Sequence, residues 1–407
     1  MSIKIQASKQ INATITLPSS KSISNRVLLI HALAKGKCPL RNLSECDDTQ
    51  VLIHALQSDS LTLDIQAAGT AMRFLTAYLA ITPGTKVLTG TERMQQRPIR
   101  VLVDALRSLG AQINYLGEEG FPPLKITGNK LHRSEIELPG NISSQYISAL
   151  LMIAPMLPQG LHIKLTSEII SRPYIDLTLQ LMTQFGAKAS WTGASELRVE
   201  PKPYQEVDFE VESDWSAASY WYEMIALTSD GQVTLPHLFE QSIQGDRRVA
   251  QLFESLGVKT TYQKDAVTLS RMERTTKQLE IDFVNQPDLA QTFVVTCCLL
   301  HLPFHFTGLQ SLKIKETDRL LALTQELLKL GYVLHQEDDS ILWWNGERCT
   351  PADQAIDTYQ DHRMAMAFAP ACLVLGDIEI NHPEVVSKSY PSFWKDLEAA
   401  GFTMNKQ

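Results

Sequence analysis

SDWSAASYWYEMIAL, residues 213–227, places small and polar residues directly before an apolar run with helical spacing. Five further segments repeat this design: SKSISNRVLLIHALA (20–34), AAGTAMRFLTAYLA (67–80), ISSQYISALLMIAPML (142–157), QPDLAQTFVVTCCLL (286–300) and TYQDHRMAMAFAPACLVL (358–375). In the last four copies, the comparable residues Ser144, Ser216, Ala290 and Arg363 recur at intervals of 72, 74 and 73 residues. In the first two copies, Ser22 and Gly69 are 47 residues apart. Such regular self-similarity indicates a repeat architecture.

A second helix is predicted after each copy, and most of these helices end at a glycine. The segments DALRSLG, LQLMTQFG, LFESLG, ELLKLG and LEAAG close at Gly110, Gly186, Gly257, Gly331 and Gly401. A glycine just past a helix commonly adopts the left-handed conformation that ends it. The short stretches SEIELPG, LHIKLTS, LRVEP, VTLS and DIEINHP alternate polar and apolar residues, which predicts strands.

We therefore infer an α/β fold with six copies of one unit. A chain of 407 residues would group them into two globular domains of three units each. The extended segment around Val207–Asp214 is the predicted boundary. A single doubly wound sheet is the alternative, and it fits the even spacing less well.

Composition excludes several classes of protein. The formal net charge is −8, with 45 acidic and 37 basic residues and no basic stripe, so nucleic acid is not an expected partner. The six cysteines form no CxxC pair, and neither a zinc site nor a disulfide framework is expected. The N-terminus lacks the apolar core of a signal peptide, and the longest apolar run, 293–304, is too short to span a bilayer. We expect a cytoplasmic monomer without a membrane segment.

Cations accompany the small and polar residues at several predicted helix starts. A helix start has open backbone N–H groups and favours anions. Ordinary capping explains any one such start, whereas several in one cleft would make a site for more than one anion. No GxxxxGK[ST] or GxGxxG motif supports a nucleotide-binding loop. The cations concerned are Lys21, Arg26, Arg73, Arg172, Lys315, Arg319 and Arg363.

The most charged segment is 313–319, KIKETDR, at a predicted helix start. Glu316 between Lys315 and Arg319 is either part of a solvated capping turn or a proton carrier whose pKa the two cations would lower. The segment Asp47–Thr49 also reads as a helix start, where capping is favoured over catalysis. His301 and His305 have metal-pair spacing, but Pro303 between them argues against one helix, and no metal is expected.

Seven motifs taken together resemble the EPSP synthases, the 3-phosphoshikimate 1-carboxyvinyltransferases, in one order from residue 17 to residue 394. They are SKSISNR, AAGTAMRF, ERMQQRPI, ISSQ, SRPYID, IKETDR and TYQDHRMAM. The resemblance implies an inside-out α/β barrel fold of two domains, each of three βαβαββ units, with the active site in the cleft between them. It implies a shikimate 3-phosphate side at 19–211 and a phosphoenolpyruvate side at 1–18 plus 212–407. It also implies no cofactor.

The resemblance further implies roles for individual residues. Lys21, Asp288 and Glu316 would be catalytic. Shikimate 3-phosphate would be bound by Lys21, Ser22, Arg26, Ser143, Ser144, Gln145, Ser171, Tyr174, Asp288, Ser311 and Lys315. Phosphoenolpyruvate would be bound by Lys21, Gly69, Arg97, Gln145, Glu316, Arg319, His362, Arg363 and Lys388.

The chain departs from the family pattern at four positions. Ala67 and Ser311 replace asparagines near the substrate phosphates, and Ser19 replaces a glycine. Phe74 replaces a proline whose position influences the response to glyphosate, so this departure bears on inhibitor sensitivity more than on activity.

Two rival functions are weighed against this resemblance. An enolpyruvyl transferase acting on a UDP-sugar normally carries a reactive loop cysteine, and no cysteine here has a matching setting. A non-catalytic anion-binding protein would not need Lys21, Asp288, Glu316 and His362 together, since a binder requires no proton carriers.

Overall fold

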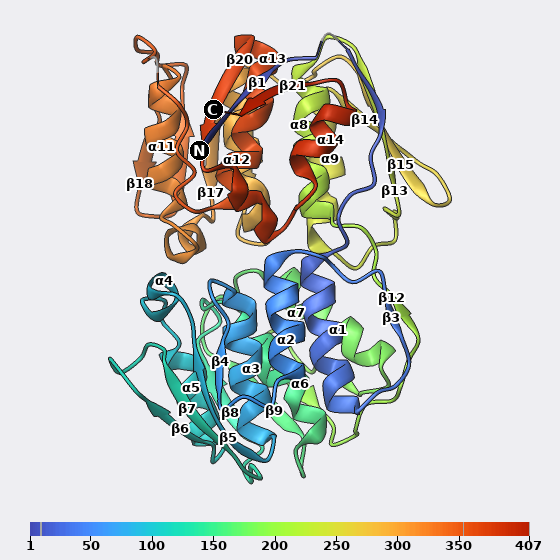
Figure 1. Ribbon diagram of the computed structural model, residues 1–407, viewed down its shortest axis with the longest axis vertical. Coiled ribbons are helices and arrows are strands. Elements are labelled where there is room, and N and C mark those ends of the chain that lie inside the picture. The colour runs from blue at the N-terminus through green and yellow to red at the C-terminus, as the bar shows by residue number, and fades with distance from the viewer. Residues whose placement is uncertain (9, 353, 407) are drawn as a thin grey trace. The chain divides into compact units, whose positions relative to one another are not determined.

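The computed structural model describes residues 1–8, 10–352 and 354–406, which form two compact units (Figure 1). Unit 2 is the continuous segment Ser19–Val211. Unit 1 combines the first 18 residues with the segment that starts at Glu212. No helix in the described ranges is long and apolar enough to cross a membrane.

Four sheets share one topology, in which two parallel strands are followed by an antiparallel hairpin that lies beside the second strand. Unit 2 holds two of these sheets, with the order β4–β5–β7–β6 and β8–β9–β11–β10. Their strands are β4 Thr62–Asp64, β5 Gly84–Thr89, β6 Gln112–Tyr115, β7 Leu124–Gly128, β8 Glu135–Leu138, β9 Leu161–Leu165, β10 Ala189–Trp191 and β11 Glu196–Val199.

Unit 1 holds the other two, with the order β2–β13–β15–β14 and β16–β17–β19–β18. The strands are β2 Ile11–Thr14, β13 Gly231–Pro236, β14 Val258–Tyr262, β15 Ala266–Arg271, β16 Leu279–Asp282, β17 Phe304–Thr307, β18 His335–Glu337 and β19 Ile341–Trp344. Each sheet is therefore one βαβαββ unit.

The two remaining repeats have reduced sheets. In unit 2, β12 (Phe209–Glu210) pairs in parallel with β3 (Leu40–Arg41). In unit 1, β1 (Ser2–Gln6) lies between β20 (Asp377–Asn381) and β21 (Thr403–Lys406). An isolated parallel bridge from Ile356 to Ile380 takes the place of the first strand. The N-terminal strand thus completes the last repeat.

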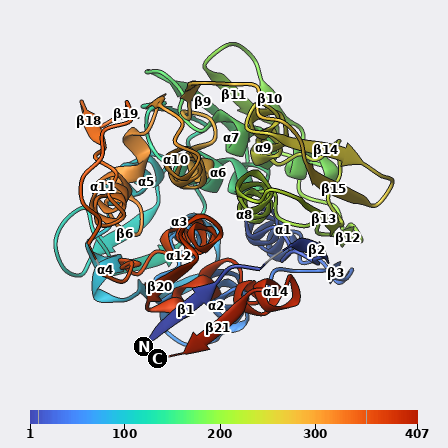
Figure 2. The ribbon, with the colours of Figure 1, turned by 90° about the horizontal axis from the view of Figure 1, so that it is seen from above.

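The six predicted helix starts all begin helices, and these helices form the cores of the two units. In unit 1, α8, α10 and α12 lie side by side with the sheets around them (Figure 2). All residues of α10 and α12 are buried, as expected for mainly apolar helices in the centre of a unit. The helices are α1 Lys21–Ala34, α3 Gly69–Ile81 and α6 Ser144–Ile153 in unit 2, and α8 Trp215–Leu227, α10 Ala290–Leu299 and α12 His362–Phe368 in unit 1.

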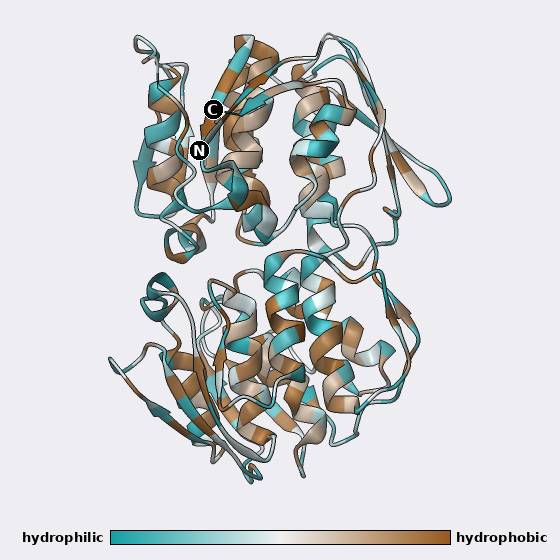
Figure 3. Ribbon diagram, in the orientation of Figure 1, coloured by the Kyte–Doolittle hydropathy of each residue, from teal (hydrophilic) through white to brown (hydrophobic). Residues whose placement is uncertain are grey.

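The second helix of each repeat lies further out and has a polar face, as the mixed colours of α11 show in Figure 3. The five predicted terminal glycines all have positive φ, between 82° and 106°, which confirms the prediction. These helices are α2 Asp47–Gln57, α5 Arg100–Ser108, α7 Arg172–Gln184, α9 Val249–Glu254, α11 Arg319–Lys329 and α14 Phe393–Ala399. Short helical turns complete the chain: α4 Glu92–Gln95, α13 Cys372–Leu375, η1 Ala154–Met156, η2 Gly245–Arg248, η3 Pro287–Leu289, η4 Gln310–Ile314, η5 Ala369–Ala371 and η6 Pro383–Lys388.

Candidate active site

The predicted site residues of unit 1 gather where η3, the segment before α11, and α12 meet. Asp288 on η3 contacts three cations: Arg363 Nη2 at 2.8 Å, Arg319 Nη1 at 3.4 Å and Lys315 Nζ at 3.6 Å. Burial by itself would raise the pKa of Asp288, but these cations outweigh it and lower the pKa well below the usual range. Asp288 is therefore ionised near neutral pH and can accept a hydrogen bond.

Arg319, which is 1% exposed, connects the carboxylates of this group. It donates to Asp361 from Nε at 2.6 Å and from Nη2 at 3.3 Å, and to Glu316 Oε2 from Nη2 at 3.0 Å. Burial by itself would lower the pKa of Arg319, but the carboxylates of Asp361, Glu316 and Asp288 together outweigh it and raise the pKa. Burial lowers the pKa of Lys315, and Asp288 offsets part of that shift.

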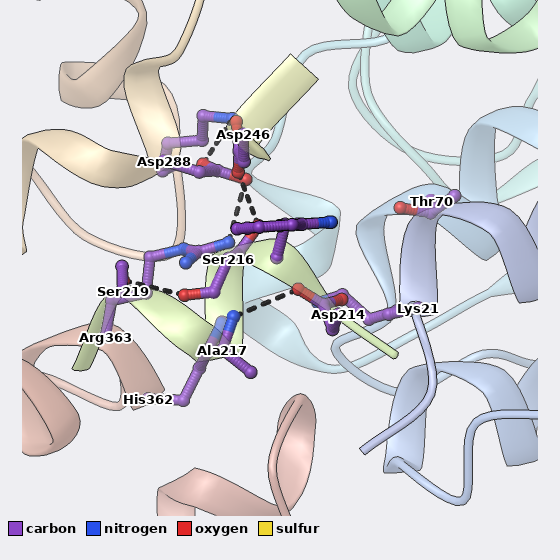
Figure 4. A network of polar contacts seen from close by, with 12 residues as sticks. Lys21, Thr70, Asp214, Ser216, Ala217, Ser219, Asp246, Asp288, His362 and Arg363 are labelled. Carbon is purple, nitrogen blue, oxygen red and sulfur yellow. Dashed lines mark hydrogen bonds and ion pairs between the residues drawn. The ribbon is translucent and has the colours of Figure 1, made fainter. Parts of the chain in front are cut away.

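Asp361 is the N-cap residue of α12 and holds the next two predicted residues in place. Its Oδ1 accepts the backbone N–H of Arg363 at 2.9 Å and lies 3.7 Å from His362 Nδ1. The Arg363 side chain continues to the Tyr220 hydroxyl at 3.3 Å and to Asp288 (Figure 4). Asp361 was missed in the sequence, although an aspartate directly before a predicted helix is a capping signal.

Asp246 on η2 is a second residue that the sequence did not suggest. It is buried, accepts a hydrogen bond from Ser216 on α8, and lies near Asp288 and Arg363 (Figure 4). Burial, reinforced by the charge of Asp288, raises the pKa of Asp246 to about 7. The cluster therefore holds one carboxylate kept ionised and another that titrates near neutrality.

Two further predicted residues flank this group. Lys388 at the end of η6 donates to the Gln360 carbonyl at 2.9 Å, immediately before Asp361. Ser311 on η4 has a buried Oγ without a hydrogen-bond partner in the described part of the chain. The charged segment does precede a helix, since Asp318 caps α11 by accepting from Leu321 N–H at 3.1 Å.

In unit 2, Gly69 at the start of α3 lies directly against Arg97. A Cβ atom added to Gly69 would be 2.6 Å from Arg97 Nη1, so only glycine permits this approach. Arg97 is 8% exposed, and its Nε is buried without a hydrogen-bond partner in the described ranges. Next to it, Gln145 Nε2 donates to Thr70 Oγ1 at 3.1 Å. A guanidinium with spare donors at a helix start is suited to bind an anion.

Lys21 is the first residue of α1, and its Nζ lies 3.3 Å from Asp48 Oδ2. The prediction that Asp47–Thr49 starts a helix is confirmed, because α2 begins at Asp47. The expected capping role is wrong: the N-cap residue is Cys46, with no side-chain capping bond. Asp48 instead pairs with Lys21, and Thr49 donates to Asn25 at 2.9 Å.

The side chain of Arg26 is buried in the interior of unit 2. Its Nε donates to Thr178 at 2.7 Å and its Nη1 to the Ser22 carbonyl at 2.8 Å, while longer bonds reach Ser148 and the Tyr174 carbonyl. Burial lowers the pKa of Arg26 to about 10. Arg26 thus joins α1 to α6 and α7, and its contact with a substrate carboxylate stays a prediction.

The remaining predicted residues of unit 2 occupy helix starts. Ser143 caps α6 by accepting from Gln145 N–H at 3.4 Å, and Ser144 is the first residue of that helix. Ser171 precedes α7 with a φ of 55°. Two other cations noted at helix starts have structural partners: Arg73 donates to the Gly69 and Pro98 carbonyls, and Arg172 stacks on Trp191.

The described residues contain no group of three or more His, Cys, Asp or Glu placed to hold a metal ion. His301 follows the end of α10 and His305 lies in β17, so the two do not share a helix. The predicted break at Pro303 is therefore confirmed.

Comparison with known proteins gives a consistent result. The family model of EPSP synthase (3-phosphoshikimate 1-carboxyvinyltransferase) matches residues 5–58 and 53–397. A 3-phosphoshikimate 1-carboxyvinyltransferase of Bacteroides fragilis (strain YCH46) is 61% identical over 399 residues, which cover 98% of this chain and 97% of the relative. One from Sulfurovum sp. (strain NBC37-1) is 38% identical over 430 residues, covering 98% and 99%.

A solved structure of EPSP synthase from Acinetobacter baumannii has a TM-score of 0.79 and 21% identity, and the match covers 100% of both chains. This likeness confirms the predicted α/β fold. The chain therefore belongs to the EPSP synthase family, the 3-phosphoshikimate 1-carboxyvinyltransferases, and is a transferase of the shikimate pathway.

Proposed function

We propose that this chain carries out its family's reaction with the residues described above. The reaction moves the enolpyruvyl group of phosphoenolpyruvate to the 5-hydroxyl of shikimate 3-phosphate and releases inorganic phosphate. The observation that carries the proposal is the network around Arg319, which joins Asp288 and Glu316 through one guanidinium.

The chemistry requires proton transfer at two atoms. Protonation of C3 makes C2 of phosphoenolpyruvate electrophilic, and the 5-hydroxyl loses its proton as it attacks C2. A tetrahedral phosphate ketal forms, and loss of phosphate together with a C3 proton gives the carboxyvinyl ether. Asp288, kept ionised by its cations, is suited to hold the hydroxyl, while Glu316 and Lys315 are suited to carry protons.

The anionic groups of both substrates need cationic and N–H donors. Lys21, Ser143, Ser144 and Ser171 offer donors for shikimate 3-phosphate at the helix starts of unit 2. Arg97 beside Gly69 offers donors for the phosphate of phosphoenolpyruvate, and Arg363 offers them for its carboxylate. A charge-assisted hydrogen bond contributes about 1.5–3 kcal/mol, so a small set of these donors offsets the repulsion between the substrates.

Phosphate release measured after mixing the purified protein with both substrates tests the reaction. We expect release only when shikimate 3-phosphate and phosphoenolpyruvate are both present. Release from phosphoenolpyruvate alone, or none from the mixture, would contradict the proposal. The monomeric state and cytoplasmic location stay predictions, and light scattering after size-exclusion chromatography tests the first.

A further inference from the structure

The turn that precedes α12 contains two consecutive residues in the left-handed conformation, and neither is a glycine. Tyr359 has a φ of 53° and Gln360 a φ of 56°. Residues other than glycine adopt this conformation at a cost in free energy, and they keep it only where surrounding contacts impose it. The turn leads directly into Asp361, His362 and Arg363, so it sets where these side chains begin.

Contacts on both sides hold this turn. The Tyr359 hydroxyl donates to Glu326 Oε1 at 2.6 Å and lies 2.9 Å from Gln325 Oε1. Lys388 Nζ donates to the Gln360 carbonyl at 2.9 Å. Burial and the neighbouring Glu326 carboxylate raise the pKa of Tyr359, so the phenol keeps its proton and remains a donor.

Glu326 is fully buried on α11, and each of its contacts points to the segment before α12 or to the cation that stabilises it. Its Oε2 accepts the backbone N–H of Asp357 at 3.0 Å and lies 2.8 Å from Lys329 Nζ. Lys329 continues to the Ala355 carbonyl at 3.1 Å and to Asp357 Oδ2 at 2.9 Å. A buried carboxylate with a cation and two further donors is a fixed anchor.

The contacts follow a regular pattern along α11. Every second residue of the segment, 355, 357, 359 and 361, bonds to this helix, and the partners run backward from Lys329 through Glu326 to Arg319. The last of these pairs, Arg319–Asp361, belongs to the active-site network. The helix that carries Arg319 at its start therefore also fixes the path of the chain that delivers Arg363.

We propose that Glu326 and Tyr359 are positioning residues for the phosphoenolpyruvate side of the reaction. They act through the left-handed turn, which they hold in the conformation that places His362 and Arg363. The inference rests on the proposed role of Arg363 in binding phosphoenolpyruvate. It assigns a function to a polar pair, a buried glutamate and a half-buried tyrosine, outside the residues proposed to contact substrate.

The test is Tyr359→Phe, which removes one hydroxyl and keeps the ring. We expect the KM for phosphoenolpyruvate to rise about tenfold, as for loss of a hydrogen bond to a charged group, while the KM for shikimate 3-phosphate changes less than twofold. Tyr222→Phe is the matched control, because the Tyr222 hydroxyl on α8 of the same unit pairs with Thr260 at 3.0 Å. An equal rise in that control would mean general loosening and would overturn the proposal.

A second variant tests the turn itself. Glycine adopts positive φ readily, so adding Gln360→Gly to Tyr359→Phe should recover at least threefold of the loss in affinity for phosphoenolpyruvate. A double variant no better than Tyr359→Phe, or a Tyr359→Phe protein with wild-type KM values, would refute the positioning role. Arg363→Lys separates the two proposals. An unchanged KM for phosphoenolpyruvate in Arg363→Lys would refute the proposed role of Arg363. A raised KM in Arg363→Lys together with a wild-type KM in Tyr359→Phe would refute only the positioning role.

Discussion

The two units repeat one design but satisfy their buried cations differently. In unit 2, Arg26 and Arg73 donate to hydroxyl groups and backbone carbonyls. In unit 1, Arg319 and Arg363 donate to carboxylates. Carbonyl and hydroxyl oxygens solvate a guanidinium without cancelling its charge, so Arg26 on α1 and Arg73 on α3 keep their positive charge.

The unit 1 network is close to charge balance. Lys315, Arg319 and Arg363 face the carboxylates of Asp288, Glu316 and Asp361. A balanced and largely buried network changes its proton distribution when a ligand displaces one partner, which suits proton transfer. Under the proposed function, this difference in partners suits the helix starts of unit 2 to anion binding, and it suits the unit 1 network, which also binds through Arg363, to acid–base chemistry.

The sharpest way to break this comparison is Glu316→Gln. If unit 1 supplies acid–base catalysis, kcat should fall by about 10²–10⁴-fold, the usual contribution of a positioned proton carrier. Binding of shikimate 3-phosphate, followed by calorimetry, should change little. A kcat near wild type would remove Glu316 from the mechanism.

Gly69→Ala tests whether unit 2 is the binding set. The added methyl group would meet Arg97 at 2.6 Å and displace it, so we expect the KM for phosphoenolpyruvate to rise by about 10–100-fold, the loss of one to two charge-assisted bonds. Gly193→Ala is the matched control, since a Cβ there would meet nothing within 4 Å. A normal KM in Gly69→Ala would show that Arg97 does not need this approach.

Asp246→Asn sharpens the comparison through pH. Because the pKa of Asp246 is raised to about 7 in the folded protein, the folded state holds a proton that the unfolded state has lost above pH 4. The contribution of Asp246 to stability therefore falls as pH rises from about 4 to 7. Asn keeps the acceptor for Ser216 but does not titrate.

We expect the free energy of unfolding of Asp246→Asn minus that of wild type to increase by on the order of 2 kcal/mol from pH 5 to pH 8. Urea unfolding at both pH values measures it. A difference that does not vary with pH would show that Asp246 is not protonated in the folded protein.

The smallest expected effect concerns the ion pair between Lys21, at the start of α1 in unit 2, and Asp48. Asp48→Asn removes the charge 3.3 Å from Lys21 and leaves an acceptor in place. Because partly exposed ion pairs contribute about 1 kcal/mol or less, kcat/KM should change by about two- to threefold. A loss in kcat/KM as large as that in Glu316→Gln would place Asp48 in the catalytic machinery. It would contradict the assignment of acid–base chemistry to unit 1.

Much of the fold was predictable because its signals are local. Each core helix begins at the small and polar cluster that the sequence displays, and glycines such as Gly257 and Gly331 end helices with positive φ. A repeat multiplies each weak signal, because the same marker must recur at nearly constant spacing. The reaction was predicted from the family motifs and not from the repeat.

The partners of the site residues were not predictable in the same way. A buried arginine in the sequence does not reveal whether it meets a carboxylate, as Arg319 does, or hydroxyls and carbonyls, as Arg26 does. Asp246 and Glu326 carry no motif, and their surroundings come from elements far away in the chain. Such contacts depend on tertiary packing, which periodicity does not encode.

The strand β1 has a consequence for synthesis on the ribosome. It is synthesised before unit 2, whereas its two partners, β20 and β21, are synthesised after unit 2, so residues 2–6 remain unpaired until residues 377–381 and 403–406 have been made. Unit 2 is continuous and can fold while translation proceeds. While unit 2 is being synthesised, the nascent chain therefore carries β1 as an unpaired strand, which exposes it to chaperones or to mispairing with neighbouring polysomal chains.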